Sequence, residues 1–179
     1  MKKDTAGKRA VFFPVYTKER EGPYLIKRTV KNIAEMVNGR LTNPQYEQTV
    51  IHGVATDTRK LEQHQLFIPL KGERFDGHSF VEQAFEAGVA AVLWDRSVPN
   101  PPENHAVILV DDTLTALQQL AKAYLQELGT RVIGVTGSNG KTTTKDMIHA
   151  VLGTQYRVHK TGGNFNNHIG LPLTVLAMP

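Results

Sequence analysis

Residues 131–153 read RVIGVTGSNGKTTTKDMIHAVLG, and this stretch decides the fold class because it places a glycine-rich loop between a strand and a helix. Residues 132–136 form an apolar run typical of a buried strand, and residues 141–152 have a helical pattern that Gly153 can end. A further short strand is predicted at residues 156–159. This order of strand, helix and strand is typical of an α/β fold with a parallel sheet.

The loop within this stretch has the residue types of a phosphate-binding loop. Glycines let backbone N–H groups turn toward the phosphates, at a helix N-terminus whose dipole favours anions. Lys141 should reach the β- and γ-phosphates of a nucleotide, and the Thr142 hydroxyl should ligate Mg²⁺. Val135 stands where the common G-x-x-x-x-G-K-[ST] pattern has glycine, so the loop is a variant. The alternative is a glycine turn with a surface lysine. ATP binding is assigned to Gly137, Ser138, Asn139, Gly140, Lys141, Thr142 and Thr143.

A second glycine- and amide-rich segment, TGGNFNNHIG at residues 161–170, follows the next predicted strand. Ligands of open α/β sheets bind at the carboxyl ends of strands, so this segment is expected beside the phosphates. Its amides, Asn164, Asn166 and Asn167, are candidate partners of ATP. The alternative is a surface turn, since glycine and asparagine are common turn residues.

Two upstream loops suit a polar, anionic ligand. They are TDTR at residues 56–59 and KGERFDGH at residues 71–78, and each follows a predicted strand. Both combine forked or hydroxyl donors, and the second adds flexible glycine. Taken singly, each loop is better explained by turn chemistry and surface ion pairs.

The rest of the chain up to residue 130 alternates strands with helices. A short helix is expected with Val30, Ile33, Met36 and Val37 on one face, begun by Thr29 and closed by Gly39. The capping box of Ser79 and Glu82 predicts a helix over residues 80–87 that Gly88 ends. Strands are predicted at residues 50–56, 66–70, 89–94 and 106–110, and a long helix at 114–128 before Gly129. This long helix is expected to join two domains.

Composition excludes several classes of protein. The chain has 179 residues and no cysteine, which excludes disulfide frameworks and fits a reducing compartment, so we expect a cytoplasmic protein. The net charge is +4, but residues 1–24 hold six Lys/Arg against three acids, so the remainder carries only +1. We therefore expect no nucleic-acid partner. No apolar run approaches the roughly 18 to 20 residues of a membrane span. Residues 1–24 show no period and are expected to be an unpatterned extension.

Together these motifs resemble the ATP-dependent Mur ligases of peptidoglycan synthesis. The loop of that family has the form TG-(S/T)-(N/S)-GKT, which residues 136–142 match, and it also lacks glycine at the place of Val135. The likeness is greatest to the members that add D-alanyl-D-alanine to UDP-N-acetylmuramoyl-tripeptide. It rests on TDTRKL at residues 56–61, LFIPLKGERFDGH at 66–78 and GNFNNHIGLPLTVL at 163–176.

The resemblance implies two domains that bind different ligands. Residues 25–128 would form a small α/β domain that binds the uridine diphosphate of the substrate, and residues 129–179 would begin a parallel-sheet ATPase domain. The implied uridine diphosphate contacts are Thr56, Thr58, Arg59, Glu73, Arg74 and Phe75. ATP would phosphorylate the terminal carboxylate of the tripeptide, and the amine of D-alanyl-D-alanine would attack the acyl phosphate. Lys141 and Thr142, with Mg²⁺, would be the catalytic residues.

The sequence also departs from the family pattern. Phosphate-loop enzymes need a second acidic partner for Mg²⁺, and no Asp or Glu follows Asp146. We therefore expect a truncated chain, monomeric and without ligase activity by itself. Residues 1–24 have no counterpart in the family, and we hypothesise an upstream over-read start. Two alternatives stay open: a nucleotide-sugar and ATP-binding module without turnover, and another phosphate-loop NTPase such as a kinase or GTPase.

Overall fold

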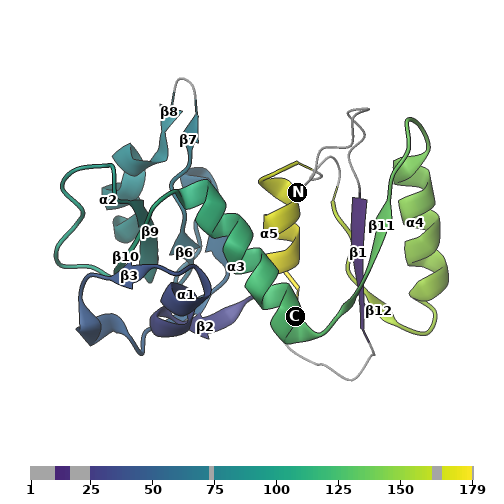
Figure 1. The fold of residues 1–179 in the computed structure, drawn as a ribbon, viewed down its shortest axis with the longest axis horizontal. Helices are drawn as coiled ribbons and strands as arrows, with labels where there is room; N and C mark the ends of the chain where they lie inside the picture. The colour runs from purple at the N-terminus through teal and green to yellow at the C-terminus, as the bar shows by residue number, and fades with distance from the viewer. Residues whose placement is uncertain (1–10, 17–24, 73–74, 163–166, 179) are drawn as a thin grey trace.

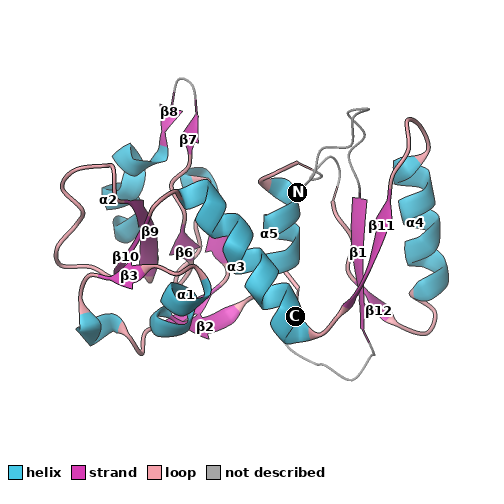
Figure 2. Cartoon of the chain, in the orientation of Figure 1, coloured by secondary structure: helices cyan, strands magenta, loops and turns pink. Residues whose placement is uncertain are grey.

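The computed structural model describes residues 11–16, 25–72, 75–162 and 167–178, which form a mixed α/β chain (Figures 1 and 2). The elements divide into two groups. The first lobe contains β2 to β10 with α1 to α3 and α5, and the second lobe contains β1, β11, α4 and β12 (Figure 1). Helix α3 (Thr113–Leu128) leads from one lobe to the other, and α5 (Gly170–Leu176) packs along it.

The first lobe is built on a five-stranded sheet in the order β3-β10-β9-β6-β5. Strands β10, β9, β6 and β5 are parallel, and β3 joins the edge of the sheet antiparallel to β10. Their bounds are Arg40–Leu41 (β3), Val107–Val110 (β10), Ala91–Asp95 (β9), Leu66–Phe67 (β6) and Val54–Ala55 (β5). Strands are therefore confirmed within all four ranges that the sequence predicts in this lobe.

Apolar side chains cover both faces of this sheet. Alternate strand residues point to opposite faces, so Leu93 packs in one cluster with α1 (Val30–Met36), α3 and α5. Val92 packs in the other cluster with α2 (Val81–Glu86). Every residue of β9 and β10 is buried, as expected of parallel strands with helices on both faces. Burying a side chain such as Leu93 contributes about 1.5–3 kcal/mol.

Two pairs of short strands and three 3₁₀ turns complete the first lobe. Strand β2 (Lys27–Thr29) pairs with β4 (Val50–His52), and β7 (Lys71–Gly72) pairs with β8 (Phe75–Asp76). The turns are η1 (Pro44–Tyr46), η2 (Thr58–Lys60) and η3 (Gly77–Phe80). The β7–β8 pair forms a hairpin at one end of the lobe (Figure 1).

The first helix begins as predicted and ends differently. The amide of Asn32 donates to the Thr29 hydroxyl at 3.2 Å, which confirms Thr29 as the N-cap of α1. The left-handed residue after the helix is Asn38 (φ 50°), not Gly39. Gly39 serves packing instead, because a Cβ there would lie 2.5 Å from the Ile108 methyl carbon on β10.

The predicted capping box is wrong. Helix α2 begins at Val81, two residues after Ser79, and its N-cap, Phe80, makes no side-chain capping hydrogen bond. The turn η3 precedes it, and the Asp76 carboxylate accepts a hydrogen bond from the His78 amide at 2.9 Å at the start of that turn. The chain has therefore turned before Ser79 can act as a cap. The left-handed stop at Gly88 (φ 91°) is confirmed.

Helix α3 is confirmed with its predicted end at Gly129, which has φ 59°. The Asp112 carboxylate caps its start by accepting from the Thr115 amide at 2.6 Å. The Tyr124 hydroxyl donates to the carbonyl of Met178 at 2.9 Å, so the end of the described chain is tied to α3. Helix α5 was not expected from the sequence. The helices in the described part of the chain lack the length and apolar composition of a membrane span.

The second lobe contains β11 (Arg131–Val135), α4 (Lys141–Leu152) and β12 (Arg157–Val158), close to the predicted elements. A strand within the first 24 residues, β1 (Val11–Tyr16), lies between β11 and β12 and is antiparallel to both. No local pattern in residues 1–24 predicts this strand, because it forms by pairing with strands more than a hundred residues away along the chain. Since both partners run opposite to β1, β11 and β12 are parallel to each other with one strand between them (Figure 1).

Candidate functional site

The glycine loop between β11 and α4 has a backbone that requires its glycines. Gly137 has φ 156° and Gly140 has φ 77°, and the second value is in the left-handed region that strains a residue with a Cβ. No side chain caps α4, and its first turn holds no acidic residue. The N-terminal amides of a 12-residue helix are thus presented without a competing carboxylate, as in an anion-binding helix terminus.

Lys141, the first residue of α4, folds back over the loop. Its ammonium donates to the carbonyl oxygen of Gly137 at 2.6 Å and lies 3.5 Å from that of Ser138. The lysine ammonium therefore lies beside the backbone carbonyls of the glycine loop. Ser138, Asn139, Thr142 and Thr143 are all exposed. The predicted ATP contacts of residues 137–143 thus gather on one loop and one helical turn.

The three predicted asparagine contacts have different outcomes. Asn164 and Asn166 lie outside the described residues. The Asn167 side-chain oxygen accepts hydrogen bonds from the amides of Ile169, at 3.2 Å, and Gly170, at 2.6 Å. Asn167 therefore orders the start of α5 in this structure, a role that the sequence did not indicate. A contact between Asn167 and ATP stays a prediction.

The TDTR loop follows β5 and forms the turn η2. The Asp57 carboxylate accepts from the Arg59 amide at 3.0 Å and pairs with both Nε and Nη2 of the Arg59 guanidinium, at 2.9 and 2.7 Å. This hydrogen-bonded pair lowers the pKa of Asp57 to about 2. The Arg59 side chain is 84% exposed, and Thr56 and Thr58 are half-buried beside it. The loop thus presents a guanidinium whose direction is set by a neighbouring carboxylate.

The β7–β8 hairpin carries the other predicted substrate contacts. Glu73 and Arg74 lie outside the described residues. Phe75 is 56% exposed, and its ring stacks on that of Phe80 with the centroids 5.2 Å apart. An exposed aromatic ring held by a second ring is a platform on which a flat ligand can stack.

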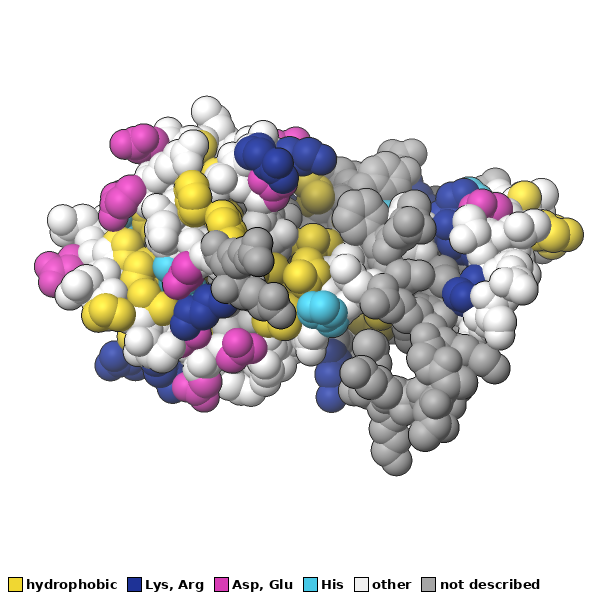
Figure 3. Space-filling model, turned by 90° about the horizontal axis from the view of Figure 1, so that it is seen from above, with side chains coloured by type: hydrophobic (Ala, Val, Ile, Leu, Met, Phe, Trp, Pro, Cys, Tyr) yellow, Lys and Arg dark blue, Asp and Glu magenta, His cyan; other side chains and the backbone are white. Residues whose placement is uncertain are grey.

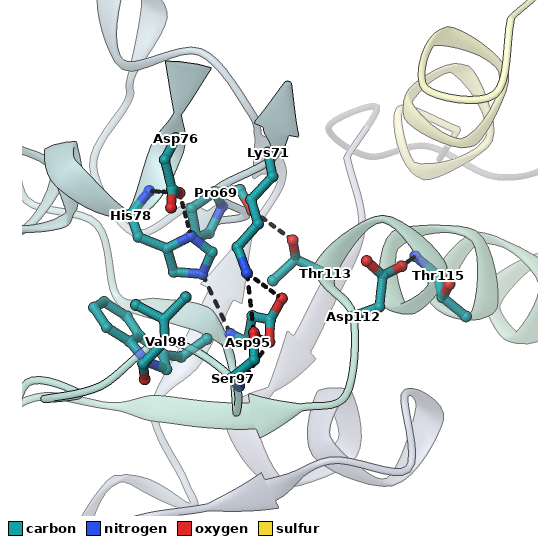
Figure 4. A network of polar contacts seen from close by, with 11 residues as sticks. Pro69, Lys71, Asp76, His78, Asp95, Ser97, Val98, Asp112, Thr113 and Thr115 are labelled. Atoms are coloured by element: carbon teal, nitrogen blue, oxygen red, sulfur yellow. Dashed lines mark hydrogen bonds and ion pairs between the residues drawn. The ribbon is translucent and has the colours of Figure 1, made fainter. Parts of the chain in front are cut away.

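A polar network anchors this hairpin to the sheet (Figure 4). The Lys71 ammonium donates to the Asp95 carboxylate at the end of β9 at 2.7 Å and to the Ser97 hydroxyl at 3.1 Å. On the other strand of the hairpin, the carboxylate of Asp76 lies 2.6 Å from Nδ1 of His78. The Nε2 of His78, in η3, accepts from the Asp95 amide at 3.3 Å, so Asp95 bonds to β7 directly and to β8 through His78 and Asp76.

Asp95 is the centre of this network and is buried. Burial alone would raise the pKa of its carboxyl, but hydrogen bonds from Lys71 and Ser97 outweigh that effect and lower the pKa to about 2. Lys71, His78 and Asp95 were not among the predicted site residues. Lys71 and His78 flank the predicted contacts in KGERFDGH, but nothing in the sequence links them to Asp95.

The candidate uridine diphosphate contacts lie in the first lobe and the glycine loop lies in the second, whereas Asn167 precedes α5 of the first lobe. Figure 1 shows the β7–β8 hairpin and the start of α4 at the same, upper end of the molecule. Figure 3 views that end, where acidic and basic side chains of the described residues are interspersed on the first lobe. His, Asp and Glu side chains of the described residues form no group of three that suits a metal ion. Thr142 as a Mg²⁺ ligand stays a prediction from the motif; Mg²⁺ usually binds few protein groups and several phosphate oxygens and waters.

The fold and the loop define a mixed α/β protein with a glycine loop of the nucleotide-binding type. Comparison with known families matches residues 50–125 to "Mur ligase family, catalytic domain" and residues 135–179 to "Mur ligase middle domain". The chain belongs to the Mur ligase family.

Relatives with assigned names agree with this membership. The chain is 97% identical over 155 residues to UDP-N-acetylmuramoyl-tripeptide–D-alanyl-D-alanine ligase of Bacillus subtilis, covering 87% of this chain and 34% of the relative. The ligase of the same name from Escherichia coli is 39% identical over 155 residues, with 86% and 33% covered. The chain thus spans about a third of the length of these curated relatives.

Solved structures are similar as well. A crystal structure of MurF from Acinetobacter baumannii has a TM-score of 0.73 at 31% identity, covering 87% of this chain and 34% of that one. MurF ligase from Thermotoga maritima, solved in complex with ADP, has a TM-score of 0.53 at 28% identity, with 69% and 28% covered.

Proposed function

We propose that the chain belongs to an ATP-dependent ligase of peptidoglycan precursor synthesis that joins D-alanyl-D-alanine to UDP-N-acetylmuramoyl-tripeptide. The observation that carries this proposal is the 97% identity over 155 residues to a ligase of that name. The glycine loop at the start of α4 supports it independently, since ATP-driven amide formation needs a phosphate site. We place the reaction in the cytoplasm, which the absence of cysteine fits.

The proposed chemistry proceeds through an acyl phosphate. The γ-phosphoryl group of ATP moves to the terminal carboxylate of the tripeptide and ADP leaves. The amine of D-alanyl-D-alanine then attacks the acyl carbon, and phosphate leaves as the amide bond forms. Lys141 would release the carbonyl of Gly137 and turn its ammonium to the β- and γ-phosphates, where it offsets the developing charge. Mg²⁺, held through Thr142, would neutralise phosphate charge when bound.

The uridine diphosphate group is proposed to bind the first lobe. Arg59 and the hydroxyls of Thr56 and Thr58 suit the pyrophosphate, because a guanidinium fork and hydroxyls donate to phosphate oxygens. Phe75 offers an exposed aromatic face on which a uracil ring can stack. Glu73 and Arg74 are kept in this proposal because they lie in the sequence between Lys71 and Phe75. The proposed division is residues 25–128 for the uridine substrate and residues 129–179 for ATP.

A second function, binding without turnover, is proposed for residues 1–179 taken alone. The observation that favours it is the lack of any Asp or Glu after Asp146, together with coverage of about a third of the relatives. A Mur-type ligase needs a further carboxylate for Mg²⁺.

Calorimetry on the purified chain tests both proposals. We expect binding of UDP-N-acetylmuramoyl-tripeptide and of Mg-ATP at one site each, and no phosphate release when both are mixed with D-alanyl-D-alanine. Preference for GTP over ATP would contradict the ligase. Phosphate release coupled to amide formation would contradict binding without turnover. The expected monomer is checked in the same samples by light scattering.

A further inference from the structure

Helix α4 buries a charged residue and exposes apolar ones. Lys145 is its one buried residue, with 4% of the residue exposed. Met147 and Val151 on the same helix are 64% and 69% exposed. Burying an ammonium group is costly unless it is hydrogen-bonded, whereas an apolar residue would fill the same place without that cost. The position of Lys145 therefore needs a reason beyond packing.

The contacts of Lys145 connect α4 to the segment that follows β12. Its ammonium donates to the carbonyl oxygen of Thr161 at 2.9 Å and lies 3.7 Å from the Asp146 carboxylate. Thr161 is itself only 1% exposed. The Lys160 ammonium donates to Asp146 at 2.8 Å on the outer side, and this bond lowers the pKa of Asp146. Two adjacent residues of α4 thus hold the chain at residues 160–161.

Lys145 also lies one helical turn after Lys141. Residues four apart in a helix share a face, so the two lysines follow each other along α4. Lys141 donates to the loop carbonyl of Gly137, and Lys145 donates to the carbonyl of Thr161. One face of α4 therefore bonds both to the glycine loop and to the start of the amide-rich segment at residue 161.

We propose that Lys145 is a positioning residue of the nucleotide site. It fixes the backbone at Thr161 against α4, on the same helix face that carries Lys141 and one turn after the glycine loop. Its buried charge also adds a positive potential behind the loop, since charges interact more strongly where water is excluded. This inference rests on the proposed binding of ATP and deepens it.

Calorimetry with Mg-ATP, Mg-ADP and AMP on three variants of the full chain tests the role of Lys145. K145M keeps the length of the side chain and removes its charge and its hydrogen bond. We expect K145M to weaken Mg-ATP binding by about tenfold, the size expected for one charge-assisted hydrogen bond. K145R keeps the charge and a donor, so its affinity should stay within about threefold of the parent. K160M, which removes the exposed outer bond, is the matched control and should change affinity by less than about twofold.

The series of nucleotides separates positioning from a general loss of structure. A role directed at the phosphates predicts that K145M loses most affinity for ATP, less for ADP and least for AMP, with binding of the uridine substrate unchanged. An equal loss for all ligands, or a folded K145M that binds Mg-ATP within twofold of the parent, would overturn the inference alone. If the parent chain binds no Mg-ATP, both the proposed ATP site and the proposed role of Lys145 are wrong. If K145M does not fold, a folded K145R that loses tenfold or more still overturns the proposal.

Discussion

Strands β9 and β11 show how differently the two lobes are built. All five residues of β9 are buried between α-helices on both faces of its sheet. Each residue of β11 is exposed or half-buried, and its sheet has three strands, one of them supplied by residues 11–16. The apolar side chains of Val132, Met147 and Val151 all remain exposed in this second lobe. Among the residues whose burial the structure describes, the two apolar clusters therefore belong to the first lobe, and the glycine loop lies in the second.

The largest effect that this comparison predicts is on stability. Leu93→Ala removes a fully buried side chain of β9 and should lower the free energy of unfolding by about 2–5 kcal/mol. Val132→Ala, its counterpart in β11 at 39% exposure, should cost less than about 1 kcal/mol. Urea unfolding followed by far-UV circular dichroism, which reports the helices and strands of both lobes, measures both costs. Equal costs at the two positions would refute the contrast.

A smaller effect is predicted for the network at the end of β9. Asp95→Asn leaves the Lys71 ammonium without its carboxylate partner and should cost about 1–3 kcal/mol at pH 7. The pKa of Asp95 is lowered from 3.8 to about 2, so its ionised form stabilises the fold above pH 3.8 and this contribution disappears as the pH falls toward 2. Unfolding of the parent and of D95N from pH 7 to 2 should show the difference shrinking below about pH 4. A difference that stays constant would contradict the assigned pKa.

The smallest effect concerns an exposed ring in each lobe. Phe75→Ala should change stability by less than about 0.5 kcal/mol, because the ring is 56% exposed. It should weaken binding of the uridine substrate by about two- to tenfold, the range of one aromatic stacking contact. Tyr156→Ala, at 40% exposure in the second lobe, is the matched control and should leave that binding unchanged. Equal losses in both variants would argue against stacking on Phe75.

The sequence predicted the elements that depend on local pattern. Helix α4 has its predicted bounds, and α3 ends at Gly129, because helical spacing and glycine stops lie within a few residues of each other. Strand β1 was not predicted, since it depends on pairing with β11 and β12 far along the chain. Helix α5 was missed because it has glycine and proline in its first turn, and it is ordered by Asn167 and by packing on α3.

The same distinction holds for the candidate site. The residues of the phosphate loop are contiguous, so their convergence was predictable from the motif alone. The anchoring of the β7–β8 hairpin joins Lys71 to Asp95, 24 residues apart, and Lys145 bonds to Thr161, 16 residues away. Such long-range hydrogen bonds depend on how strands and helices pack, which the sequence alone did not reveal. Buried polar networks are therefore the part of the site that needed the structure.

Calorimetry on Lys141→Ala and Arg59→Ala tests most directly the claim that the two lobes bind different ligands. The account predicts that K141A loses about tenfold or more in affinity for Mg-ATP and keeps its affinity for UDP-N-acetylmuramoyl-tripeptide within about twofold. R59A should show the reverse, because its guanidinium belongs to the first lobe. Loss of both ligands in either folded variant would contradict the division between the lobes.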